Sequence, residues 1–79
     1  MSETINAKAL TKTANKLREA IKHSRMAYLF CPSPYTHSAF QACLTAAGAF
    51  DEYVEALAFA TSAEWLRKFP KIIEQNHVE

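Results

Sequence analysis

The sequence contains a single glycine, Gly48, among its 79 residues. β-Hairpins and β-sandwiches need glycine at their turns, so a chain with so little of it is a poor candidate for a β fold. Fourteen alanines, the residues with the highest helix propensity, are present instead. The composition therefore predicts an all-α fold.

Long apolar runs are also missing. No stretch approaches the roughly 18 to 20 apolar residues that cross a bilayer, and the first six residues, MSETIN, do not form a basic segment leading into an apolar one as in a secretory signal. With 49% hydrophobic and 22% charged residues the chain is too apolar for disorder. We therefore expect a single cytoplasmic domain over residues 1–79, with no membrane partner and a core small enough to profit from dimerisation.

Apolar residues recur at spacings of three and four along two stretches, which predicts two long helices. The first covers about residues 6–30, with Thr4 or Asn6 as its cap. Cys31-Pro32-Ser33-Pro34 interrupts it, because proline lacks an amide donor and disfavours a helical conformation in the residue before it. Ser33 and Pro34 also form a start signal for a second helix, over about residues 34–60. We expect this helix to continue through Gly48, and a break there is the alternative.

A third helix is expected over about residues 62–75, because Thr61 and Glu64 have the spacing of a capping box. Two long helices joined by a four-residue loop pack antiparallel, and both apolar stripes repeat every seven residues, as in a left-handed coiled coil. The predicted architecture is an antiparallel helical hairpin with a short C-terminal helix, which two copies could combine into a dimeric helical bundle.

Residues that could support catalysis or bind metal are badly spaced. His23, Cys31, His37 and Cys43 lie six to eight positions apart, whereas structural zinc sites pair ligands two to five apart. Cys43 would lie roughly 13 to 14 Å along the second helix, too far from the loop for a disulfide to Cys31. We expect two free thiols, no metal, no cofactor and no catalytic residues, so that the protein is not an enzyme.

The acidic residues Asp51, Glu52 and Glu55 cluster on the second helix. Since Asp51 and Glu55 are one helical turn apart, in the arrangement usual for solvent-facing side chains, we expect them to be solvated.

Charge is divided unevenly along the chain. Residues 6–30 carry a net charge of +5 and residues 31–79 a net charge of −3, and Glu3 brings the total to +1. One interpretation is that the first helix binds nucleic-acid phosphates; the other is that its basic face is solvated, or complemented by the acidic second helix of the same chain or a neighbour. The nucleic-acid alternative would use Lys8, Lys12, Lys16, Lys22 and Arg25.

Several aromatic residues lie outside the two main stripes. Either the third helix covers them or they form a face for association. We therefore predict a small non-enzymatic interaction or regulatory protein that binds a larger protein or a second copy of itself, similar in kind to the accessory inhibitors and modulators of phages and plasmids. The predicted contact residues are Tyr35, Tyr53, Phe59 and Trp65.

Overall fold

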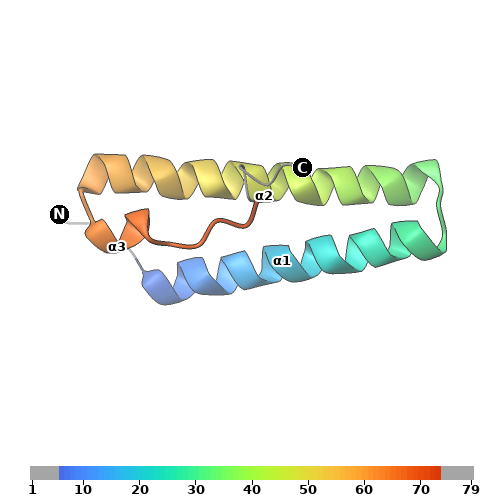
Figure 1. Ribbon diagram of the computed structural model, residues 1–79, viewed down its shortest axis with the longest axis horizontal. Helices are drawn as coiled ribbons and strands as arrows, with labels where there is room; N and C mark the ends of the chain where they lie inside the picture. The colour runs from blue at the N-terminus through green and yellow to red at the C-terminus, as the bar shows by residue number, and fades with distance from the viewer. Residues whose placement is uncertain (1–5, 74–79) are drawn as a thin grey trace.

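The computed structural model describes residues 6–73 and confirms the predicted all-α hairpin. Its elements are α1 (Ala7–Phe30), α2 (Pro34–Thr61) and α3 (Glu64–Arg67). Figure 1 shows α1 and α2 side by side and antiparallel, with the connecting turn at one end and α3 beside the start of α1 at the other. The body measures 48 × 28 × 15 Å. We call the end with the turn the hairpin end and the opposite one the open end.

Local capping explains where both long helices begin. The side chain of Asn6 caps α1 by accepting a hydrogen bond from the Ala9 amide at 3.1 Å. At the start of α2, the Ser33 hydroxyl accepts from the Thr36 amide and the Thr36 hydroxyl accepts from the Ser33 amide. Pro34 occupies the first turn, where no amide donor is needed. The predicted starts of both helices are thus confirmed.

α2 continues through Gly48, as expected. A Cβ atom built on Gly48 would meet nothing within 4 Å, so this glycine does not serve a close backbone approach.

The third helix is much shorter than the expected 62–75, and the predicted capping box is wrong. α2 extends to Thr61, whose hydroxyl donates back to the Leu57 carbonyl at 2.6 Å, and Ser62 ends the helix in the left-handed conformation with φ 59°. α3 then begins after Ala63 without a side-chain cap and spans Glu64–Arg67. Pro70 explains the early end, because it disfavours a helical conformation in the residue before it. Residues 68–73 are not helical, and residues 74 and 75 of the expected helix lie outside the described range.

The core is small and concentrated toward the open end. Leu10, Val54, Ala58 and Leu66 form its buried cluster, with Phe50, Leu57, Ala63 and Phe69 packed against it. Ala14 and Ala47 are the most deeply buried positions, at 1% and 0% exposure. None of residues 15–46 is buried, so the half of the hairpin that includes the turn has only a half-buried seam between its helices.

Candidate functional site

Asp51 holds the C-terminal segment, residues 68–73, against the hairpin. Its side chain is buried at 5% exposure, and its two oxygens accept hydrogen bonds from the amides of Ile72 at 2.9 Å and Ile73 at 2.8 Å. The expectation that Asp51 is solvated is therefore wrong. The sequence did carry a signal for it, since Asp51 falls in the apolar series Ala47, Val54 and Ala58 at spacings of four and three.

Two further contacts fix the C-terminal segment. Lys71 forms an ion pair with Glu55 at 3.0 Å on the surface. The ring of Phe69 packs against Phe50 and, edge-on, against Trp65, with centroids 6.4 and 6.3 Å apart. The segment thus runs back from α3 along the hairpin instead of projecting into solvent (Figure 1).

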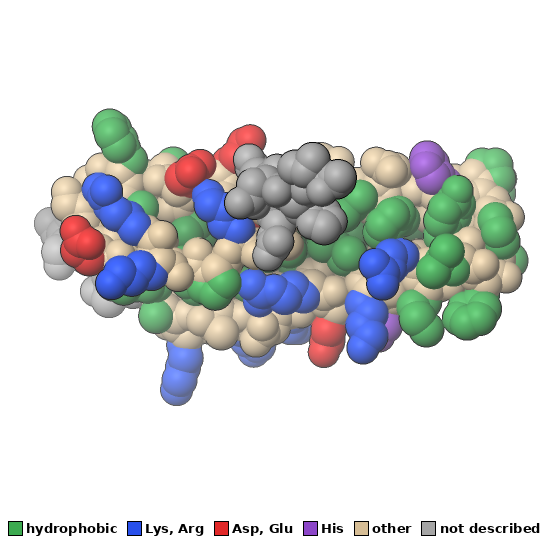
Figure 2. Space-filling view, viewed as in Figure 1, with side chains coloured by type: hydrophobic (Ala, Val, Ile, Leu, Met, Phe, Trp, Pro, Cys, Tyr) green, Lys and Arg blue, Asp and Glu red, His purple; other side chains and the backbone are tan. Residues whose placement is uncertain are grey.

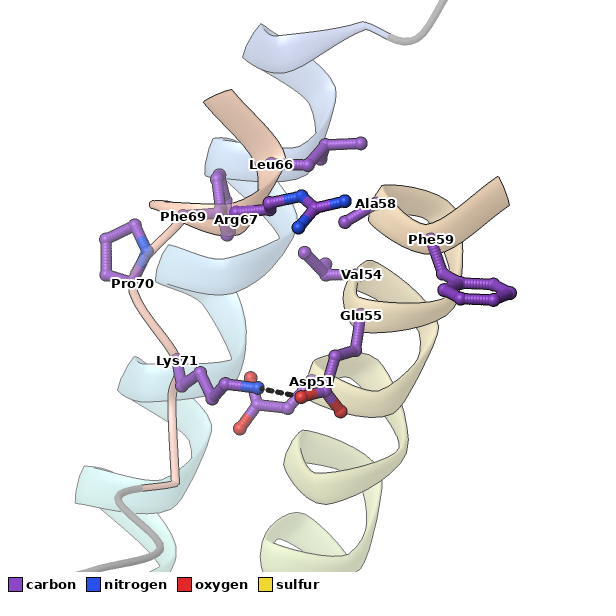
Figure 3. A pocket seen from close by; sticks show the side chains of 10 residues that line it. All are labelled: Asp51, Val54, Glu55, Ala58, Phe59, Leu66, Arg67, Phe69, Pro70 and Lys71. Atoms are coloured by element: carbon purple, nitrogen blue, oxygen red, sulfur yellow. Dashed lines mark hydrogen bonds and ion pairs between the residues drawn. The ribbon is translucent and has the colours of Figure 1, made fainter. Parts of the chain in front are cut away.

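A pocket of about 400 Å³ lies between α2 and this returning chain. Figure 3 shows the side chains of α2 on one side and those of α3 and the C-terminal segment on the other, with the Glu55 to Lys71 ion pair at one end. The buried Val54, Ala58 and Leu66 contribute apolar surface. We call this the α2–α3 pocket; it is lined by Asp51, Val54, Glu55, Ala58, Phe59, Leu66, Arg67, Phe69, Pro70 and Lys71.

The hairpin end is a second candidate surface. Met26, Leu29, Phe30 and Tyr35 are exposed there by 45%, 65%, 81% and 85%. Residues 26–50 contain no Asp, Glu, Lys or Arg. Figure 2 shows the result, an end with many hydrophobic side chains and no Asp, Glu, Lys or Arg on this face, with a histidine beside them. We call these four residues the hairpin-end patch.

The four predicted contact residues are all exposed but do not form one surface. Tyr35 belongs to the hairpin-end patch, Phe59 lines the α2–α3 pocket at 86% exposure, and Trp65 lies on α3 against Phe69. Tyr53 is on α2, 18 residues beyond Tyr35 and about 27 Å along the helix. The short α3 leaves each of these side chains at least 40% exposed, so it does not cover them as one interpretation required. Sequence reasoning missed Met26, Leu29 and Phe30 as members of an apolar patch.

The basic residues of α1 are all exposed, including Lys8, Lys12, Lys16, Lys22 and Arg25. Within residues 6–73 no ion pair joins α1 to α2, so the acidic second helix of the same chain does not neutralise them directly. Arg18 donates to Asn15 on its own helix at 3.1 Å.

The cysteines and histidines of the described region remain apart. Cys31 is an exposed free thiol in the turn, and Cys43 is a half-buried one on α2. His37 packs its ring against Tyr28, 5.3 Å between centroids. The part of the chain between residues 6 and 73 contains no group of three or more side chains able to hold a metal ion, and no helix in that part combines the length and apolar character of a membrane span.

No protein-family model, curated protein or solved structure matches this chain. Its function is therefore inferred from its own surfaces, among which the hairpin-end patch and the α2–α3 pocket offer apolar contact area.

Proposed function

We propose that the protein is a non-enzymatic helical interaction module that binds a larger protein, and that the hairpin-end patch is its main docking surface. One observation carries this proposal: the half of the hairpin around the turn combines exposed apolar side chains with a seam in which none of residues 15–46 is buried. A partner placed there would bury both the patch and the open seam.

The size of the patch is consistent with a docking surface. Large aromatic side chains bury about 150 to 250 Å² each, so Phe30 and Tyr35 at 81% and 85% exposure offer on the order of 300 Å², to which Met26 and Leu29 add. A contiguous apolar patch of roughly 300 to 600 Å² is the largest that a typical monomer exposes, and such patches are often functional. Tyr28, stacked on Phe40 with centroids 6.4 Å apart, helps hold the two helices of the hairpin in place close to the turn.

Site-specific photocrosslinking tests the proposal in cells that naturally produce the protein. A photoreactive phenylalanine analogue replaces Phe30, and the matched control carries it at Thr11, an exposed position on α1 outside the patch. We expect a covalent adduct with a protein at position 30 and none at position 11. The adduct should disappear in a Leu29→Ser/Tyr35→Ser variant that keeps its helical circular dichroism. Equal adducts at both positions, or none, would contradict docking through the hairpin end.

The interaction module could also bind a second copy of itself, and an exposed face of α2 supports this self-association. Tyr35 and Tyr53 belong to a series at spacings of four and three in which every member is exposed: Tyr35, Ala39, Ala42, Ala46, Ala49, Tyr53, Ala56 and Ala60. If two copies paired antiparallel about the midpoint of Ala46 and Ala49, each Tyr35 would face Ala60 and each Tyr53 would face Ala42. Each tyrosine would then pack against an alanine, and alanine would face alanine at the remaining positions, which allows the two helices to approach closely.

Mixing two cysteine variants tests this pairing after the native thiols are removed by Cys31→Ser and Cys43→Ala. Ala39→Cys and Ala56→Cys would face each other across an antiparallel pair but lie about 25 Å from their own copies. We expect a disulfide-linked dimer only in the mixture. Links in each variant alone would indicate parallel pairing, and no link in any sample would exclude this contact.

Nucleic-acid binding through α1 is the second candidate, favoured by the absence of ion pairs to α2 among the described residues. Lys8, Lys12, Lys16, Lys22 and Arg25 would contact phosphates. Affinity for a DNA duplex should then fall stepwise as these residues are replaced by glutamine, in a gel-shift assay in dilute buffer. No shift with the wild-type chain would dispose of this candidate.

A further inference from the structure

We propose that the α2–α3 pocket binds a small amphipathic molecule with an apolar body and one carboxylate. This site is separate from the hairpin-end patch and does not depend on docking there. The pocket volume of about 400 Å³ lies within the range of small-molecule sites, about 300 to 1,000 Å³.

The apolar part of the ligand is specified by the lining of the pocket. Val54, Ala58 and Leu66 are 6%, 6% and 2% exposed and present aliphatic surface from two different elements. Phe69 and Pro70 add apolar surface from the C-terminal segment, and Phe59, 86% exposed, lies at the rim of the pocket with its ring turned away from α3 (Figure 3). An aliphatic or aromatic body would be removed from water on this surface, which is the main source of binding free energy for apolar groups.

The charge of the ligand follows from which charged groups are already engaged. The pocket is lined by two acids and two bases. Asp51 accepts hydrogen bonds from two backbone amides, and Glu55 is paired with Lys71. Arg67 is the remaining charged side chain, and it forms no ion pair within residues 6–73.

Arg67 is well placed to receive a carboxylate. Figure 3 shows its side chain extending from α3 across the pocket toward Ala58 and Val54 of α2. A guanidinium binds a carboxylate through two parallel hydrogen bonds. A cationic ligand would be repelled by Arg67, and both acids of the pocket already have partners, Asp51 two backbone amides and Glu55 the Lys71 side chain. A phosphate would bring more charge than one guanidinium can match onto a largely apolar lining.

Titration of the full chain with octanoate tests the site, followed by the amide NMR signals of Val54, Ala58 and Leu66. Two comparison ligands separate the contributions: acetate has the carboxylate without the chain, and 1-octanol has the chain without the charge. We expect saturable shifts with octanoate and an affinity at least about tenfold weaker for each comparison ligand. 1-Octanol lacks the hydrogen bond to a charged group, which contributes roughly that factor or more, and acetate lacks the apolar chain that binding removes from water. Octanoate that causes no shifts, or that binds no better than 1-octanol or acetate, would overturn the proposal.

A matched pair of variants assigns the charge recognition. Arg67→Gln removes the proposed carboxylate partner, whereas Lys68→Gln removes the same charge from the next residue, which does not line the pocket. Both side chains are exposed, so both variants should keep the wild-type spectrum elsewhere. We expect octanoate affinity to fall about tenfold or more in Arg67→Gln and to stay within about twofold in Lys68→Gln. An equal loss in both variants would mean that general positive charge, and not a site, attracts the ligand.

Discussion

Replacing Asp51 by asparagine should release the C-terminal segment while leaving the hairpin folded. The carboxylate accepts from the Ile72 and Ile73 amides at 2.9 and 2.8 Å and is 5% exposed. An asparagine of nearly the same shape keeps one acceptor oxygen and turns an NH₂ group toward the second amide, so that two donors face each other. One charge-assisted hydrogen bond is lost and the other becomes a neutral one. Since hydrogen bonds to charged groups contribute about 1.5 to 3 kcal/mol, the segment should lose about 2 to 4 kcal/mol of docking free energy.

Amide hydrogen exchange measures this loss directly. Where the segment opens without global unfolding, 2 to 4 kcal/mol corresponds to exchange of the Ile72 and Ile73 amides faster by about 30-fold to 1,000-fold. Glu52→Gln is the control. It also removes one negative charge, but from an exposed side chain at the position next to Asp51. Exchange at Ile72 and Ile73 that is unchanged in Asp51→Asn, or accelerated equally in Glu52→Gln, would refute the role assigned to the Asp51 carboxylate.

Three further substitutions test the fold. Gly48→Ala should stabilise the protein by about 1 kcal/mol, because the added Cβ meets open space and alanine is the better helix former; the melting temperature should rise by about 4 to 8 °C, and a fall would argue against a continuous α2. Ser33→Ala should lower the free energy of unfolding, measured in urea, by about 1 kcal/mol because it removes the cap of α2, and Ser33→Gly should lower it by only a few tenths. Equal losses in the two variants would indicate that Ser33 does not stabilise the protein as a helix cap. Glu55→Gln should change the free energy of unfolding by less than about 1 kcal/mol, because its side chain in the pair with Lys71 is 70% exposed; a larger loss would indicate that the pair does more than hold a surface contact.

The long helices could be predicted from the sequence because their determinants are local. Two prolines and a capping serine mark the turn, an asparagine marks the first start, and seven-residue apolar repeats run through both elements. The short α3 could not be predicted in the same way. The Thr61 to Glu64 motif competes with continued growth of α2, and in the structure α2 includes Thr61 and ends at a left-handed Ser62.

The candidate sites depend on contacts between distant parts of the chain. Asp51 and Ile72 are 21 positions apart, and no pattern within either stretch specifies that they meet. A carboxylate in an apolar series indicates a buried acid but not its partners. The four predicted aromatic contact residues are exposed. Tyr35 and Tyr53 are separated by their distance along α2, whereas the pocket beside Phe59 depends on the course of residues 68–73.

The uncharged stretch at residues 26–50 has a consequence for the kinetics of association. Fields from exposed charges decay over about 8 Å at physiological ionic strength, and Arg25 lies about 7.5 Å along the helix axis from Phe30, so its field is reduced, but not lost, at the end of α1. A partner that docks at the hairpin end would therefore receive weaker electrostatic guidance than one on the basic face of α1, and its association rate should lie closer to the roughly 10⁵ to 10⁶ M⁻¹s⁻¹ of neutral pairs. A partner approaching the basic face of α1 would instead be steered, and its association rate would fall steeply as ionic strength rises. The ionic-strength dependence of the association rate thus distinguishes which of the two surfaces a bound partner uses.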